Sequence, residues 1–288
     1  MTLTRIHHVA LVVRDADQAL EFYRDLLGLR VALDRVIEDQ GVRGILLPMA
    51  GDGGANAPLE IEIVQPINDE NGVAKFLAKH GEGLHHVCLQ STDIAADLIA
   101  AKAAGQTMID ETPRDGMAGR IGFLHPKSNF GHLVELAQPP TNVPPTAHDA
   151  RVAPQGPVAP IGLDHLVSVV NDPALASTHF QTDFGFTETG ATEQQAMNVS
   201  SRLVDLGGSV LELATPLVPS DADPLTRELQ KGEGLLMIAL GVADVPAAVE
   251  HLRAAGVKCT DPAVISGKPR AFLSPKPANG VRLQLVGF

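Results

Sequence analysis

Four short apolar segments of the sequence each carry histidine or glutamate, the side chains best suited to bind a metal ion or to move a proton. Each segment alternates as a β-strand does, so one polar side chain in each shares a face with apolar neighbours. The segments are "IHHVALVV", "LEIEIV", "LHHVCL" and "LVELA", and the side chains are His8, Glu62, His86 and Glu135. Two imidazoles and two carboxylates suit a borderline divalent ion: zinc, cobalt, nickel, manganese or iron.

Neighbouring residues offer alternatives to this set. His7 and His85 precede His8 and His86 and point to the opposite face of each strand. A single histidine in a strand is more often packed or solvated than bound to metal. A glutamate that alternates with isoleucine more often faces water, and we expect Glu60 to do so.

The two halves of the chain repeat one another in order. "GEGLHHVCL" at 81–89 matches "GEGLLMIAL" at 232–240, and "GFLHPKSNFGHLVELA" at 122–137 matches "AFLSPKPANGVRLQLV" at 271–286. Collinear matches of this kind predict a tandem duplication. The second half has His165, Glu212, Met237 and Gln284 at the four positions. Methionine and glutamine are poor replacements for imidazole and carboxylate, so we expect a degenerate second site.

A smaller unit recurs four times along the chain. In each unit an apolar strand leads to an aspartate, a helical stretch, a glycine and further short strands. Aspartate is a good helix N-cap and glycine a good helix end. The aspartates are Asp15, Asp93, Asp172 and Asp244, and the glycines are Gly28, Gly105, Gly185 and Gly256. We therefore predict an α+β fold of four βαβββ modules that form two tandem domains.

A proline-rich stretch separates the halves. Seven of the 21 prolines lie in residues 138–160. Proline fixes φ and lacks a donor, so this stretch is expected to be an extended linker. The predicted domains are 1–138, which binds the metal, and 161–288, which is degenerate, with the linker at 139–160.

Composition excludes several classes of protein. The net charge of −12 argues against a nucleic-acid partner, since phosphate binding needs a basic face. The two cysteines are far apart, and neither a signal peptide nor an apolar run of membrane length is evident. We expect a cytoplasmic protein without a membrane partner.

These motifs resemble the vicinal oxygen chelate superfamily, which includes glyoxalases, bleomycin resistance proteins and dioxygenases. The first half is similar to methylmalonyl-CoA epimerases, through "IHHVALVV", "EFYRDLLGL" and "FLHPKSNFGHLVEL". The resemblance implies a cupped sheet with His8, Glu62, His86 and Glu135 as metal ligands. It also implies Glu62 and Glu135 as catalytic bases, and Lys127 near an acyl-CoA. Lys127 equally suits a solvated turn, which "SPK" at 274–276 repeats.

The expected activity is that of a metal-dependent epimerase or isomerase which abstracts a proton next to a carbonyl. The expected substrate is a small molecule, an acyl-CoA thioester, and a homodimer is compatible with the resemblance. Some bacterial epimerases carry a further glutamate where this chain has Gly44. The alternatives are a glyoxalase-type lyase, a ring-cleaving dioxygenase that uses His8, His86 and Glu135, and a non-catalytic ligand-binding protein.

Overall fold

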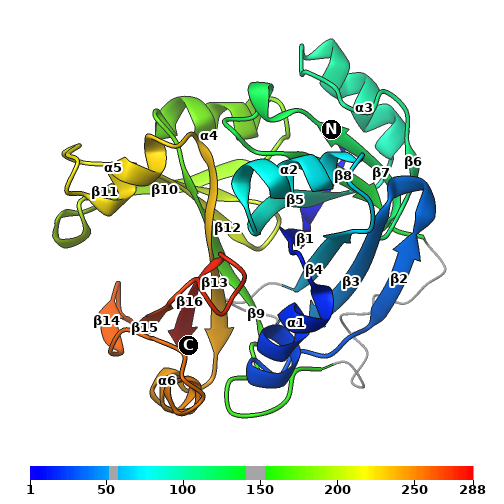
Figure 1. Cartoon of the computed structure of the whole chain (residues 1–288). Helices are drawn as coiled ribbons and strands as arrows, with labels where there is room; N and C mark the ends of the chain where they lie inside the picture. The colour runs from blue at the N-terminus through cyan, green and yellow to red at the C-terminus, as the bar shows by residue number, and fades with distance from the viewer. Residues whose placement is uncertain (52–57, 141–152, 288) are drawn as a thin grey trace. The chain divides into compact units, whose positions relative to one another are not determined.

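The computed structural model describes residues 1–51, 58–140 and 153–287 (Figure 1). Its strands form two eight-stranded sheets, one in each half of the chain, which confirms the predicted α+β class and the four βαβββ modules. The order in the first sheet is β2-β3-β4-β1-β5-β8-β7-β6, so β4, β1, β5 and β8 are consecutive. Its strands are β1 (Leu3–Val12), β2 (Leu33–Ile37), β3 (Val42–Met49), β4 (Leu59–Pro66), β5 (Gly83–Ser91), β6 (Arg114–Gly116), β7 (Gly119–Leu124) and β8 (Val134–Gln138).

The second sheet repeats this order as β10-β11-β12-β9-β13-β16-β15-β14. The pairings β1 with β4, β5 with β8, β12 with β9 and β13 with β16 are parallel, and the outer pairings are antiparallel. Its strands are β9 (Gly162–Val169), β10 (Thr187–Gln194), β11 (Val199–Asp205), β12 (Val210–Pro216), β13 (Gly234–Val242), β14 (Ala263–Ile265), β15 (Lys268–Leu273) and β16 (Arg282–Gly287).

The four predicted helices begin where the aspartates predicted them. The side chains of Asp15, Asp93, Asp172 and Asp244 each accept a hydrogen bond from a backbone N–H of the first turn. The helices are α1 (Ala16–Leu20), α3 (Ile94–Ala103), α4 (Pro173–Thr182) and α6 (Val245–Ala254), with two further helices, α2 (Gly72–His80) and α5 (Pro224–Leu229). Short 3-10 turns cover Glu38–Gln40, Pro126–Ser128 and Gln195–Met197.

The first helix departs from the predicted continuous α-helix. After Leu20 it continues as a π-helical segment over Glu21–Leu26. Gly28 follows with a φ of +80°, and a Cβ atom at that position would overlap the carbonyl oxygen of Gln155. A left-handed backbone and a close approach of another segment both require glycine here.

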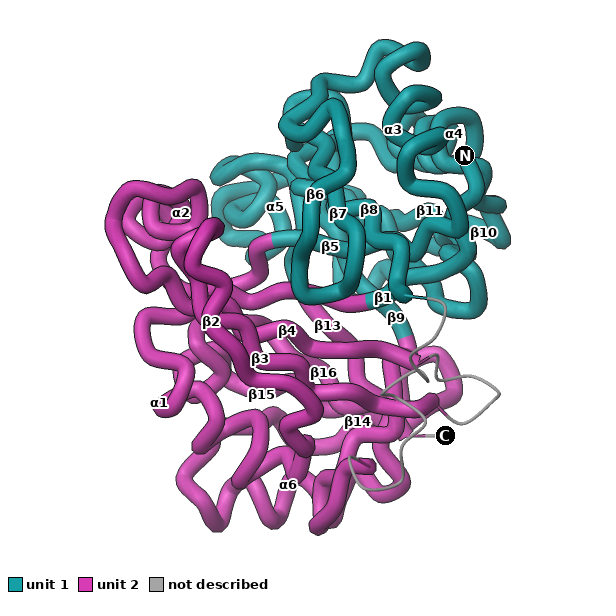
Figure 2. The backbone as a smooth tube through the Cα atoms, turned by 90° about the vertical axis from the view of Figure 1, so that its right-hand side faces the viewer, with its two compact units in different colours: residues 1–7, 86–140, 165–236 teal, residues 8–85, 141–164, 237–288 magenta. Residues whose placement is uncertain are grey.

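The chain divides into two compact units, and each unit takes segments from both halves of the sequence (Figure 2). Unit 1 contains residues 1–7, 86–140 and 165–236, and unit 2 contains residues 8–85, 141–164 and 237–288. Within unit 1, the Ile6 N–H donates to the carbonyl oxygen of Leu206. Within unit 2, the Tyr23 hydroxyl donates to the carbonyl oxygen of Ala278 at 3.0 Å.

The predicted domain boundaries at 138 and 161 stay a prediction, and residues 141–152 of the expected linker lie outside the described residues. Among the residues that the structure covers, no helix combines the length and apolar character needed to cross a membrane.

Candidate metal centre

His8 and Glu62 form a buried pair within unit 2. Their strands, β1 and β4, run parallel with Ala10 opposite Glu62, so the two side chains emerge on one face. The Nε2 atom of His8 lies 3.2 Å from Oε2 of Glu62. The residues are 1% and 6% exposed, which removes both polar groups from bulk water.

His86 and Glu135 form the corresponding pair within unit 1. They lie on β5 and β8, where Cys88 is opposite Glu135. Nε2 of His86 lies 2.8 Å from Oε2 of Glu135. The ring of Phe123 meets the His86 ring edge to face, with 5.2 Å between centroids. The residues of the pair are 4% and 3% exposed.

The four predicted ligands form one group whose ligand atoms all lie within 4.8 Å of one another. Buried carboxylates at such separations repel each other unless a positive charge offsets them, and an imidazole–carboxylate set satisfies a borderline divalent ion. The residues present therefore fit the expected metal.

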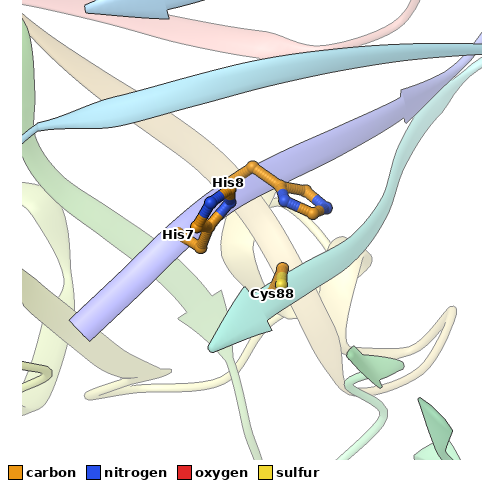
Figure 3. Close-up of side chains that lie close together, drawn as sticks. All are labelled: His7, His8 and Cys88. Atoms are coloured by element: carbon orange, nitrogen blue, oxygen red, sulfur yellow. The ribbon is translucent and has the colours of Figure 1, made fainter. Parts of the chain in front are cut away.

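A second group shares one member with the first. His7, His8 and Cys88 also bring ligand atoms within 4.8 Å of one another. Figure 3 shows the imidazoles of His7 and His8 directed to different sides of β1, with Cys88 on β5. This group has no carboxylate and takes two members from adjacent positions of one strand. The four-residue group has the better donor set for the ions expected.

Apolar side chains border both pairs. Beside His8 and Glu62, Ala10, Val12, Val42, Val64 and Leu77 form a buried cluster, against which Val73 and Phe76 of α2 pack. Beside His86 and Glu135, a second buried cluster consists of Cys88, Ala118, Ile121 and Ala137, with Phe123 against it. Such surroundings strengthen electrostatic interactions at the site, because they exclude water.

Helix α2 is the part of this surround that the sequence analysis missed. Asn71 caps it by accepting a hydrogen bond from the Ala74 N–H. Val73, Phe76 and Leu77 follow at helical spacing, and Gly81 ends the helix with a φ of +78°. The cap, the spacing and the glycine together were a signal that could have predicted it.

The neighbouring acidic and histidine residues lie as follows. Glu60 was expected to face water, and this was wrong, because the residue is 7% exposed on a strand that is buried on both faces. His7 is also buried. His85 is half-buried and meets the Phe76 ring edge to face, with 4.7 Å between centroids.

Lys127 lies on an exposed turn that the second half repeats. The His125 side chain accepts a hydrogen bond from the Lys127 N–H, and the Gly131 N–H donates to the carbonyl oxygen of Pro126. The Gly280 N–H donates to Pro275 in the same way. The repetition favours a structural role for the turn, and contact between Lys127 and an acyl-CoA stays a prediction.

The four corresponding positions of the second half hold a different set of contacts. Nε2 of His165 and Oε2 of Glu212 are 3.8 Å apart, and the Ser201 hydroxyl donates to the other oxygen of Glu212 at 2.6 Å. Gln284 accepts a hydrogen bond from Arg270 at 3.0 Å. Met237 is half-buried. No group of metal-binding residues was found here among the described residues.

Gly44 leaves the position of the additional glutamate without a side chain. It lies on β3 opposite Val64, which shares the face of Glu62. The preceding Arg43 forms ion pairs with Asp34 at 2.7 Å and Asp17 at 3.0 Å, which raise the pKa of its guanidinium. Arg43 alternates with Gly44 and is therefore directed to the other face.

Comparison with known proteins places these observations in a family. The model of the Glyoxalase/Bleomycin resistance protein/Dioxygenase superfamily matches residues 7–123 and again residues 164–272. Two matches in one chain agree with the predicted duplication.

The first half is similar to epimerases. The ethylmalonyl-CoA/methylmalonyl-CoA epimerase of Cereibacter sphaeroides is 34% identical over 46% of this chain and 97% of its own length. The mitochondrial methylmalonyl-CoA epimerase of Mus musculus is 31% identical over 47% of this chain and 74% of its own length.

The fold over the whole chain is similar to that of a mutant 4-hydroxymandelate synthase from Streptomyces coelicolor. The TM-score is 0.68 with 18% identity, covering 100% of this chain and 93% of the other. At this identity the likeness concerns the fold alone.

Proposed function

The chain belongs to the glyoxalase/bleomycin resistance protein/dioxygenase superfamily, and on that premise we propose that it is a metal-dependent epimerase. The substrate is an acyl-CoA thioester, and the reaction begins with proton abstraction next to its carbonyl. The observation that carries this proposal is the buried group of His8, Glu62, His86 and Glu135. The similarity of the first half to methylmalonyl-CoA epimerases supports this substrate class.

The four residues would hold the metal, and the chemistry is divided among them. A divalent ion at this site would polarise the thioester carbonyl and stabilise the enolate as a Lewis acid. One carboxylate, Glu62 or Glu135, takes the α-hydrogen as a proton, and the C–H electron pair passes into the enolate. The other, in its acid form, returns a proton to the opposite face of the α-carbon. Gly44 provides no base, so these two carboxylates do this work.

The imidazoles and the apolar surround have supporting parts. His8 and His86 would hold the ion together with the two carboxylates that move the proton. The clusters around Ala10 and Ile121 exclude water, which would otherwise compete for the enolate.

The test combines metal analysis with isotope exchange. The purified full chain is expected to contain about one divalent ion, and to exchange the α-hydrogen of methylmalonyl-CoA for deuterium in D₂O. His86→Ala should lose both properties. His85→Ala is the matched control: it removes the adjacent imidazole, which packs on Phe76, and should keep both.

Other outcomes of the same experiment would replace the proposal. Exchange with a hemithioacetal and none with any 2-methylacyl-CoA would identify a glyoxalase-type lyase. Oxygen uptake with a catechol and Fe²⁺ would identify a ring-cleaving dioxygenase, although Glu62 then fills a position that oxygen would need. A protein without metal after gentle purification would be a ligand-binding protein. For every one of these functions, the location of the protein in the cytoplasm and its assembly into a homodimer stay predictions.

A further inference from the structure

Arg270 of the second half is a half-buried cation whose hydrogen bond goes to a neutral group. It lies on β15, and its Nη1 donates to Oε1 of Gln284 at 3.0 Å. Its Nε atom is buried without a hydrogen-bond partner. Within the described part of the chain, no carboxylate pairs with this guanidinium. A guanidinium carries five N–H donors, and the one on Nε is the buried donor that has no acceptor here.

Three other arginines within the described residues differ from Arg270 in this respect. Arg43, Arg202 and Arg253 pair with carboxylates at 2.7 to 2.8 Å. Lys268, two residues before Arg270 on the same face of β15, has Asp164 as its partner at 2.6 Å. Charged groups that leave water are normally paired, and the buried Nε of Arg270 has no such partner.

The strand register shows what surrounds Arg270 within unit 2. Phe272 lies opposite Gln284, Arg270 lies opposite Val286, and Ala239 lies opposite Gln284 on the other side. All of these side chains share one face of the β13-β16-β15 segment. Met237 and Arg282 occupy the same face by alternation.

The first half has an apolar residue where Arg270 lies. Ile121 matches Arg270 in the repeat, is 3% exposed and belongs to the apolar cluster beside Glu135. Two differences therefore distinguish the second half here: it has the amide of Gln284 where the first half has a carboxylate, and arginine where the first half has isoleucine. Both differences make the face less negative.

We propose that Arg270 and Gln284 bind the carboxylate of a small organic acid, whose apolar part packs on Phe272 and Met237. The guanidinium would donate through Nε and a terminal nitrogen, in the two-point geometry that matches a carboxylate. The Gln284 amide, whose oxygen is occupied by Arg270, would donate its N–H. This site is independent of the metal centre proposed for the first half and needs no metal ion.

The experiment measures thermal shifts of the full chain with three carboxylates of increasing size: acetate, butyrate and benzoate. Each is compared with its neutral amide. At least one carboxylate is expected to raise the unfolding temperature through preferential binding to the folded state, while its amide does not. Arg270→Ile, which introduces the residue of the first half, should weaken that binding by at least about tenfold. Arg253→Ile, which alters the exposed pair with Asp261, is the matched control and should leave it unchanged.

A second variant keeps the test valid if Arg270→Ile misfolds. Gln284→Glu supplies an internal carboxylate to Arg270, so it should raise the unfolding temperature without ligand and abolish the response to carboxylates. The proposal is wrong if no carboxylate exceeds its amide, or if Gln284→Glu still responds. Inorganic phosphate is also tested. If it raises the unfolding temperature as much as the carboxylates do, the assignment to a carboxylate is wrong. Metal content, measured in parallel, reports on the first half separately.

Discussion

Nε2 of His132 lies 2.6 Å from the hydroxyl oxygen of Ser168, and both side chains are buried. The other ring nitrogen, Nδ1, lies 2.6 Å from the carbonyl oxygen of Asn129. This contact joins the two halves of the sequence inside unit 1. Nearby, His179 lies 3.0 Å from the Asn129 side chain, and Gln106 donates to Asp183 at 2.6 Å.

Stability is expected to fall in mild acid because of His132. Burial, the largest cause, lowers the pKa of His132 from 6.5 to about 4. Between these two pH values the His132 side chain is protonated in the unfolded chain and neutral in the folded protein. This contribution is complete above pH 6.5 and is lost as the pH falls toward 4. Between pH 7 and pH 5 the loss should be about 2 kcal/mol.

Urea unfolding at several pH values measures this effect. His132→Gln should flatten the dependence between pH 7 and pH 5, although it lowers stability at pH 7. Burial also lowers the pKa of His179, so that residue should retain a slope of the same sign. An unchanged slope in His132→Gln would contradict the assignment.

Converting the metal ligands of the first half to the residues of the second should abolish metal binding. The double variant His86→Met and Glu135→Gln gives the first half the residue types that the second half has at Met237 and Gln284. Metal affinity should fall by more than the ~10–100-fold that changes around metal ligands usually cause. Competition with a chromophoric chelator gives the affinity. Full retention of metal would show that the ion binds elsewhere, and Cys88→Ala would then test the His7, His8 and Cys88 group.

Removing the Tyr23 hydroxyl should cost stability but leave the proposed chemistry intact. Tyr23 is completely buried, and its hydroxyl donates to the carbonyl oxygen of Ala278. Burial raises the pKa of Tyr23, so the hydroxyl keeps its proton. Tyr23→Phe removes one of two donors to that carbonyl, which keeps its bond from the Val281 N–H, and should lower the free energy of unfolding by about 0.5–1.5 kcal/mol. Metal content and deuterium exchange should remain at wild-type values, and a loss of either would give Tyr23 a role in the site.

The fragment 1–138 is expected to associate with itself. It lacks the partners of His132 and Tyr23, and it exposes surface that Leu206 and its neighbours cover in unit 1. A second copy of the fragment is the available partner that resembles the missing half. Sedimentation at micromolar concentration should show dimers or larger species. A monomeric fragment with the unfolding temperature of the full chain would contradict this expectation.

The sequence predicted the strands and the ligand candidates because their periodicity survives in the fold. Alternation alone left His7 or His8 and His85 or His86 open as candidates, and the family resemblance selected His8 and His86. Glu60 was misassigned although it lies two residues before Glu62 and therefore on the same face of β4, and both residues are buried. The π-helical segment over Glu21–Leu26 was missed because a helical period of about 3.6 does not reveal a local bulge.

The repeats could not predict which segments of the chain make up each of the two units. A tandem duplication suggests that each half folds on itself, but Ser168 and Ala278 pair with residues of the first half. Such contacts depend on which modules pack together. All four modules share one pattern of strands and helix, so the pattern does not reveal which modules pack together.

The mixed composition of the units has a consequence for how this gene can change. A stop codon or deletion that removes residues after 138 would take segments from both units, so both units would be incomplete. Substitutions at Met237, Gln284 and Arg270 leave the four residues of the first-half group unchanged, so the two halves can change their ligands separately.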